Sequence, residues 1–421
     1  MHLAQMLWLA VGFPFVTAAP GKRAESSPPV LGTTCVGSKY VYNELAGFGT
    51  LPSDARDKFD DTMAGLGSSI AVDKTSWKKK GDAWSGLLYA LPDRGWNTEG
   101  SINYNPRVHK FAIKFAPNPS ASVENPGKPN IAFEYLDSIL LKGPDGSPCT
   151  GLDADAVGGL SYSGFPLLPA ATFTGDGFGN DGPGGKRVTI DSEGIVLIKD
   201  GGFWISDEYG PYVYQFDSNG LMINAIAPPE AILPVRNGSV SFSSNSPPRF
   251  DPDVQVTPAT PSHGRQNNQG FEGLTASPDG TALYVLLQSA AMQEGGNQTS
   301  TRWYTRFLEY DISRCGEPQP SPPKYVAEWV VPLPTYTTAA NKTAIAAQSE
   351  VHYVSKNQFL VLARDSGAGQ GQDSATSLYR HIDVFDISKA TNVKGTNQDS
   401  FSGSIASSSK CYTSLQPGMM R

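Results

Sequence analysis

Three segments of the chain carry acidic side chains at matching points. Each begins with a glutamate and closes on a polar residue 15 or 16 positions later, the pairs being Glu193 with Glu208, Glu272 with Gln288, and Glu350 with Asp365. A looser, earlier copy closes on Asp93-Arg94-Gly95. Carboxylates at the same position in each copy of a repeat come close together when the copies are arranged around an axis. Such a group of carboxylates binds hard cations or activates water for hydrolysis.

The residues expected to meet at this site carry hard oxygen donors or positive charge. The expected metal ligands are Glu193, Asp207, Glu208, Glu272 and Asp365. The expected catalytic set is Asp93, Arg94, Asp207, Glu208, Glu272 and Arg364, and the groups expected to bind substrate are Arg94, Tyr209, Asn268 and Arg364. Clustered carboxylates repel one another unless a cation is bound, which favours Ca²⁺ or another divalent metal as cofactor. For any single one of these residues, the alternative to a role in the site is a structural role in a turn or in an Arg–Asp pair that joins neighbouring blades.

Strand-turn-strand units must position these side chains. Alternating apolar residues flank turns at Asp200-Gly201-Gly202, Pro278-Asp279-Gly280 and Lys356-Asn357, and Gly158-Gly159-Leu160 is another possible start of a unit. Such turns between alternating apolar runs indicate β-hairpins. Their repetition predicts an all-β, β-propeller-like fold with about five to seven blades of antiparallel sheet. A Ser/Gly-rich stretch at 400–409 could leave the last blade incomplete.

The start of the chain predicts export. An apolar run followed by small residues is typical of a cleaved secretory signal peptide, expected at residues 1–19. Residues 20–44 are expected to form a short pro-segment and N-terminal extension, 45–390 the propeller domain, and 391–421 a Ser/Gly-rich tail.

Other features agree with an extracellular location. N-glycosylation is expected at Asn237, Asn297 and Asn341, each of which begins an Asn-x-Ser/Thr triplet. The four cysteines, Cys35, Cys149, Cys315 and Cys411, are widely spaced and favour two disulfides, with the pairing left open. A net charge of −7 disfavours a nucleic-acid partner, and no second apolar segment is long enough to span a membrane. With a nucleic acid and a membrane both disfavoured, a small molecule is the expected partner.

Five short motifs resemble those of secreted, fungal-type members of the phytase-like family, which is described by an esterase-like activity of phytase. The motifs are Leu91–Trp96, Asp191–Ile195, Trp204–Pro211, Gln269–Leu274 and Ala363–Gly367. The resemblance covers roughly residues 45 to 390. It implies a β-propeller-like fold and the hydrolysis of phosphate or other esters.

These observations lead to three interpretations of function. The first is a secreted, metal-dependent phosphomonoesterase, in which carboxylates hold Ca²⁺ and an activated water while Arg94 and Arg364 neutralise the phosphate oxygens. The second is a non-catalytic binding propeller with structural calcium. The third is a carboxylesterase or lactonase that uses the same pocket. A Glu208→Gln variant separates the first two, whereas the sequence does not separate phosphate from carboxyl esters.

Overall fold

The computed structural model describes residues 31–420 apart from 64, 97, 123–124, 126, 316–321, 368–375, 408–409 and 413–414. The expected signal peptide at 1–19 and the first part of the expected pro-segment lie outside this range. The described residues contain strands and two short 3-10 turns, η1 (Met292–Glu294) and η2 (Asn397–Asp399). Among them no helix has the length and apolar character needed to cross a membrane.

Twenty-seven strands make up the described chain. Their bounds are β1 Leu31–Cys35, β2 Ser38–Tyr42, β3 Ser69–Val72, β4 Lys78–Lys80, β5 Ala83–Leu91, β6 Arg107–Phe115, β7 Ile131–Leu140, β8 Ala170–Phe173, β9 Gly185–Val188, β10 Ser192–Leu197, β11 Phe203–Asp207, β12 Val213–Phe216, β13 Met222–Ile226, β14 Val235–Arg236, β15 Ser239–Val240, β16 Phe271–Ala276, β17 Ala282–Leu287, β18 Tyr304–Asp311, β19 Lys324–Pro332, β20 Thr335–Thr337, β21 Thr343–Ile345, β22 Ala347–Ser355, β23 Gln358–Arg364, β24 Ile382–Asp386, β25 Ala406–Ser407, β26 Lys410–Cys411 and β27 Met419–Met420.

Four antiparallel sheets form the body of the molecule, and each is built mainly from strands that follow one another along the chain. Blade 1 has the order β3-β5-β6-β7 with β4 paired to β5, and blade 2 has the order β10-β11-β12-β13. Blade 3 has the order β16-β17-β18-β19, and blade 4 has the order β22-β23-β24-β27. This meander of hairpins is the unit of a propeller, so the expected fold class is confirmed.

The alternation of apolar residues along each strand holds neighbouring blades together. On β17, Leu283 and Val285 pack with blade 2, whereas Tyr284 and Leu286 pack with blade 4. All four are buried, because a central blade has a neighbour on each face and successive side chains of a strand point to opposite faces. Burial of this kind contributes about 1.5–3 kcal/mol for each large apolar side chain.

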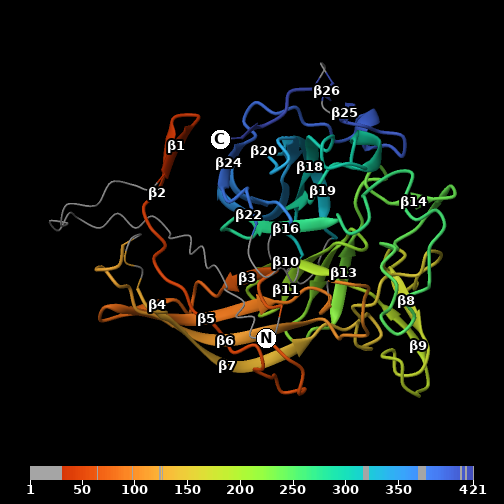
Figure 1. Ribbon diagram of the computed structural model, residues 1–421, viewed down its shortest axis with the longest axis horizontal. Helices are drawn as coiled ribbons and strands as arrows, with labels where there is room; N and C mark the ends of the chain where they lie inside the picture. The colour runs from red at the N-terminus through yellow and green to blue at the C-terminus, as the bar shows by residue number, and fades with distance from the viewer. Residues whose placement is uncertain are drawn as a thin grey trace.

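The first strands of the blades gather at a common hub. Strand β10 contacts β3 and β16, and β16 also contacts β22. The hydroxyl of Ser69 on β3 donates to the carboxylate of Glu350 on β22 at 2.6 Å, which joins blade 4 to blade 1. In Figure 1 the labels of β3, β10, β16 and β22 accordingly lie together near the centre of the molecule.

The number of blades differs from the expectation. The structure has four large sheets in the described chain rather than five to seven, because several hairpin-like stretches form separate two-stranded ribbons instead of blades. The expected unit at Gly158 is part of a loop, where Leu160 makes an isolated bridge to Leu168.

The fourth blade receives its outermost strand from the end of the described chain. Met419 and Met420 of β27 pair with Asp386 and Phe385 of β24, so this sheet has four strands. The segment that leads to β27 is packed as well, with Ile405 fully buried in a small core beside Val330 of blade 3. Within the described residues the last sheet therefore has four strands, as blades 2 and 3 do, and is not an incomplete blade.

Candidate functional site

Most of the residues predicted from the repeat meet at the hub. Glu193 and Glu272 lie on the innermost strands β10 and β16, whereas Glu208 follows β11 and Arg364 ends β23. Arg94 comes three residues after β5 of blade 1. Four blades thus contribute charged side chains to one region, as the matching positions of these residues in the repeat predicted.

A β-bulge on each of three inner strands aims side chains into the hub. On β10, Ser192 pairs with Asp207 and Ile195 with Ile205, so Glu193 and Gly194 face a single residue of β11. The same irregularity occurs on β16 at Glu272 and Gly273. A bulge adds one unpaired residue and redirects its side chain, which explains why the Glu-Gly pair recurs.

The glycines of these pairs allow the inner strands to approach closely. A Cβ on Gly194 would lie 2.5 Å from Leu274 Cβ, and one on Gly273 would lie 2.6 Å from Val351 N. Gly270 has a comparable role, since its Cβ would lie 2.2 Å from the carbonyl oxygen of Glu208. Glycine is therefore required where one blade passes the next.

The ladder of blade 4 changes the alignment of the repeat. Gln348 pairs with Ala363 and Glu350 with Leu362, so the extra residue of this bulge is Ser349. Counted along the ladders, Ser349 occupies the place of Glu193 and Glu272, while Glu350 occupies the place of the bulge glycines. The Glu350 carboxylate therefore lies between the blades, where it accepts from Ser69 of blade 1, from the amide of Leu274 of blade 3 and from the amide of Val351 on its own strand.

Three buried carboxylates form the centre of the site. One oxygen from each of Asp191, Glu193 and Glu208 lies within 4.8 Å of the other two. All three side chains are buried, and Glu208 Oε1 has no hydrogen-bond partner among the described residues. A buried acceptor without a donor costs stability, which indicates that a ligand belongs at this point.

Asp191 was not among the predicted site residues. It precedes β10 by one position, and its carbonyl oxygen accepts from Glu208 N at 3.0 Å, which places it beside Glu208. The sequence could have identified Asp191 from its position two residues before Glu193, because the side chains of alternate residues in an extended segment point the same way. The same backbone contact brings the two ends of β10 and β11 together.

Arg94 is the cation of this cluster. Its Nη1 lies 3.2 Å from Asp191 Oδ2, 3.3 Å from the Tyr209 hydroxyl and 2.5 Å from Asn268 Oδ1. Burial alone would lower the pKa of Arg94, but Tyr209, Asp191 and Glu208 together raise it above its ordinary value. Arg94 therefore contacts two other predicted substrate-binding residues, Tyr209 and Asn268, and in this structure the guanidinium is already engaged.

Glu272 lies on a second side of the hub with its own partners. Arg364 Nη2 is 3.6 Å from Glu272 Oε1, which also accepts from the side chain of Gln288. Ser349 Oγ is 3.4 Å from Glu272 Oε2 and 3.3 Å from Arg364 Nε. Glu272 is buried, whereas the Arg364 side chain is 48% exposed, so this side of the hub meets solvent.

Asp207 and Asp365 are placed differently from the other acids. Asp207 accepts from the amides of Asp191, Tyr209 and Gly210 and from the Tyr214 hydroxyl, at 2.7–3.1 Å. Asp365 accepts from the amides of Gly367, Leu378 and Tyr379. Both carboxylates thus hold backbone turns. Asp93 likewise accepts from the amide of Gly95 at 2.8 Å, within its own turn.

Burial raises the pKa of the clustered carboxyl groups. The pKa of Asp191 is raised to about 7 by burial, against the effect of Arg94, and that of Glu272 to about 8, against the effect of Arg364. Burial and then the neighbouring Glu272 raise the pKa values of Glu193 and Glu208 well above the ordinary value. Four ionised carboxylates exceed two guanidinium groups in charge, so a bound cation would favour the ionised forms of these acids.

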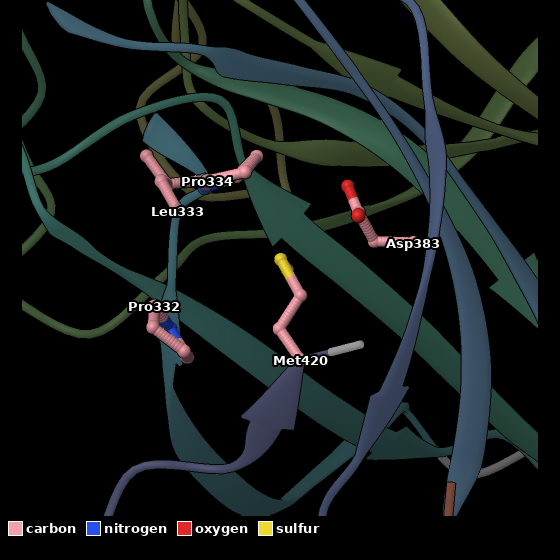
Figure 2. Close-up of a pocket in the computed structure, with 5 residues that line it drawn as sticks. All are labelled: Pro332, Leu333, Pro334, Asp383 and Met420. Atoms are coloured by element: carbon pink, nitrogen blue, oxygen red, sulfur yellow. The ribbon is translucent and has the colours of Figure 1, made fainter. Parts of the chain in front are cut away.

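Two cavities among the described residues lie away from the carboxylate cluster. The first, of about 310 Å³, is lined by Pro332, Leu333, Pro334, Asp383 and Met420 at the outer strands of blades 3 and 4, as Figure 2 shows. The second is lined by residues around Asp311 and Lys324 at the β18–β19 turn. Neither contains a member of the carboxylate cluster, and the chemistry of the side chains, rather than the volume of a hollow, identifies the site.

The residues expected to carry modifications are located as follows. The sequon asparagines Asn237, Asn297 and Asn341 are all exposed. The structure shows no disulfide among the cysteines; Cys35 and Cys149 are buried, and Cys315 and Cys411 are partly buried.

Comparison with known proteins gives one family and one near relative. The model of a family described as "Phytase-like: Esterase-like activity of phytase" matches residues 68–410. An "Uncharacterized secreted protein" of Arthroderma benhamiae is 50% identical over 396 residues, which are 92% of this chain and 76% of that protein.

Among solved structures, a candidate 6-phosphogluconolactonase from Bacteroides fragilis aligns with 84% of this chain and 76% of its own. The identity is 12% and the TM-score 0.27, so this likeness carries no argument about fold or activity.

Proposed function

Because the chain belongs to the phytase-like family, we propose that it is a secreted, metal-dependent ester hydrolase that acts on phosphomonoesters. The observation that carries the proposal is the group of Asp191, Glu193 and Glu208, whose oxygens lie within 4.8 Å of one another in a buried hub. Family membership supports hydrolysis of an ester, and the charges of the hub support a metal and an anionic substrate.

A divalent cation fits this group of residues. The donors are hard carboxylate oxygens, and Glu208 Oε1 is buried without a hydrogen-bond partner among the described residues. Hard oxygen donors suit Ca²⁺, which is available outside cells, although Mg²⁺ has similar ligands. When bound, the ion would acidify a water ligand and withdraw charge from a phosphate oxygen.

The residues around the cluster have distinct roles in this proposal. Arg94 compensates Asp191 and fixes its orientation, whereas the partly exposed Arg364 is available to bind the phosphate. An arginine can hold two phosphate oxygens at once because its N–H donors form a planar fork. Asp207 holds the turn that carries Glu208 and Tyr209.

Export supports the same conclusion. The Arthroderma benhamiae relative is named as a secreted protein. The three sequon asparagines are exposed, and we propose that they carry glycans. Both features agree with an enzyme that works in a calcium-containing medium.

The decisive experiment combines metal analysis with substrate turnover. The full-length protein, recovered from the medium of a secreting host, should contain about one divalent ion per chain by mass spectrometry, as expected for one such ligand group. It should release phosphate from phytate or p-nitrophenyl phosphate and lose this activity in chelator. A panel of carboxyl esters and lactones tests the alternative substrates.

Two variants distinguish catalysis from a structural ion. Glu208→Gln should lower turnover by at least about a hundredfold with the melting temperature in chelator maintained, because it removes a cluster carboxylate without changing its volume. Glu134→Gln, an exposed change on β7, is the matched control and should leave turnover unchanged. Absence of turnover on every ester with every metal tested contradicts the proposed function.

A further inference from the structure

Ser349 differs from the other serines of the hub. The hydroxyls of Ser192 and Ser206 are fully buried and donate to backbone carbonyl oxygens, those of Pro92 and Glu272. Ser349 is partly exposed, and its hydroxyl contacts side chains instead. It is therefore the one of these three serines that a substrate in solvent can reach.

The two contacts of this hydroxyl are a carboxylate and a guanidinium. Ser349 Oγ lies 3.4 Å from Glu272 Oε2, within reach of an acceptor for its proton. It lies 3.3 Å from Arg364 Nε, next to a cation that can hold the oxygens of an incoming phosphate. An adjacent base is one way to activate a hydroxyl for covalent catalysis, and a neighbouring positive charge can stabilise the phosphate oxygens.

The bulge of β22 creates this arrangement. Ser349 takes the ladder position that Glu193 and Glu272 occupy on the neighbouring strands, so its side chain is aimed into the same hub as those carboxylates. Arg364 takes the position of Glu208, directly after the paired residue of the second strand. One blade therefore offers a hydroxyl and a cation where another offers two acids.

We propose that Ser349 is the nucleophile of the hydrolase, and that phosphomonoesters are cleaved through a phosphoserine at this residue. The inference rests on the function proposed above and specifies how that reaction proceeds. In the first half, a bond forms between Ser349 Oγ and phosphorus while the bond from phosphorus to the alcohol oxygen breaks. The ionised form of Glu272 takes the Oγ proton and passes it to the departing alcohol.

The second half restores the enzyme. A water oxygen bonds to phosphorus, one water proton passes to Glu272, and the bond between phosphorus and Ser349 Oγ breaks. The proton returns to Oγ, and inorganic phosphate leaves. The sum consumes one water for each ester, and Arg364 faces the phosphate oxygens in both halves.

Trapping the intermediate tests this inference. The full-length protein is mixed with p-nitrophenyl phosphate and quenched in acid during turnover, and its peptides are analysed by mass spectrometry. A phosphate group is expected on Ser349. With glycerol present, the ratio of glycerol phosphate to inorganic phosphate should be the same for several leaving groups, because all substrates share one intermediate.

Variants test whether Ser349 is a nucleophile or only separates the side chains of Glu272 and Arg364. Ser349→Ala should lose the phosphopeptide and at least about a thousandfold of turnover, as removal of a nucleophile does in other hydrolases. Ser355→Ala, at the exposed far end of the same strand, is the control and should retain both.

The outcomes are distinct for the two proposals. Wild-type turnover without phosphoserine, or a Ser349→Ala variant that retains turnover, overturns the covalent step and leaves the metal-dependent hydrolase standing. Absence of wild-type turnover on all esters overturns both. If Ser349→Ala fails to fold, the phosphopeptide and the product ratio of the wild-type protein still decide the matter.

Discussion

Asp191 accepts two hydrogen bonds from Arg94, one from the backbone amide at 3.1 Å and one from the guanidinium at 3.2 Å. Both side chains are buried, so this pair fixes blade 1 to the start of blade 2 at the centre of the molecule. The carboxylate and the guanidinium lie in an environment where neither is well solvated alone. Each residue therefore depends on the other.

Removal of the cation should destabilise the fold. Arg94→Met leaves the buried Asp191 carboxylate without its partner, and we expect a loss of about 3–5 kcal/mol in the free energy of unfolding. Urea denaturation of the variant and the wild type measures it. The control is Arg249→Met, at a partly exposed pair with Glu99, where the loss should stay below about 1 kcal/mol. Equal losses for both variants contradict the role of Arg94.

The bulge glycines predict a steric effect. Gly273→Ala places a Cβ 2.6 Å from Val351 N, and because this neighbour is backbone it cannot turn aside. We expect the variant to lose about 2–4 kcal/mol of stability, as overpacked sites do. In Gly127→Ala the nearest atom belongs to the Asn118 side chain, which can rotate, so the change should be small. A normal melting temperature for Gly273→Ala shows that the blades can separate at this point.

Calcium should stabilise the protein through the carboxylate group. A ligand that binds only the folded state at a hundred times its dissociation constant adds about 2.7 kcal/mol, and chelator should remove this gain. Glu193→Gln removes one of the three clustered carboxylate charges and should abolish the calcium-dependent rise in melting temperature. Glu134→Gln should show the full rise. A rise of wild-type size in Glu193→Gln places the ion elsewhere.

Asp207 should behave as a positioning residue. Its carboxylate accepts four hydrogen bonds, and the amide of Asp207→Asn would present a donor to groups that are themselves donors. We expect about 1–3 kcal/mol of lost stability, with the calcium-dependent rise in melting temperature retained. Calorimetry with and without calcium tests both parts. Loss of the rise together with unchanged stability indicates that Asp207 binds the ion directly.

Glu350 predicts a dependence of stability on pH. Burial raises its pKa to about 7 in the folded protein, against hydrogen bonds from Ser69, Val351 and Leu274. The folded state therefore binds the proton more tightly than the unfolded state. The resulting stabilisation is complete below the unfolded pKa, near 4.5, and is lost as the pH rises through about 7.

The neutral variant Glu350→Gln isolates this effect. Between pH 5 and 8 the difference in unfolding free energy between variant and wild type should shift by about 2–3 kcal/mol in favour of the variant. Melting curves across this range measure the shift, in chelator so that metal binding does not contribute. A constant difference across the range shows that Glu350 titrates alike in the folded and unfolded states.

The fold class was predictable because its signals are local. The turns at Asp200 and Asp279 and the alternating apolar residues beside them belong to single hairpins, and these hairpins occur in the structure as β10–β11 and β16–β17. The number of blades was not predictable, because it depends on which hairpins acquire further strands. Strand β27 pairs with β24, which lies more than thirty residues earlier in the chain, and no local sequence pattern predicts that pairing.

The site was predictable in type and partly in membership. The glutamates of the repeat led to Glu193, Glu208 and Glu272, which do lie at the hub. The repeat predicted Glu350 as the counterpart of Glu193 and Glu272, whereas the ladder gives that place to Ser349, because sequence spacing does not reveal which residue is the extra one of a bulge. Asp207 and Asp365 were indistinguishable from the central acids by residue type alone, since only the structure shows which amides they accept.

The bulges separate the chemistry of the hub from the architecture that surrounds it. A bulge residue is unpaired, so its side chain can change from glutamate to serine while the ladder on each side of it is unaltered. The functional group at the bulge of each blade can therefore differ while the strand pairing around it stays the same. Ser349→Glu then converts the hydroxyl position to the carboxylate of its neighbours, and Glu272→Ser makes the reverse exchange on the next blade.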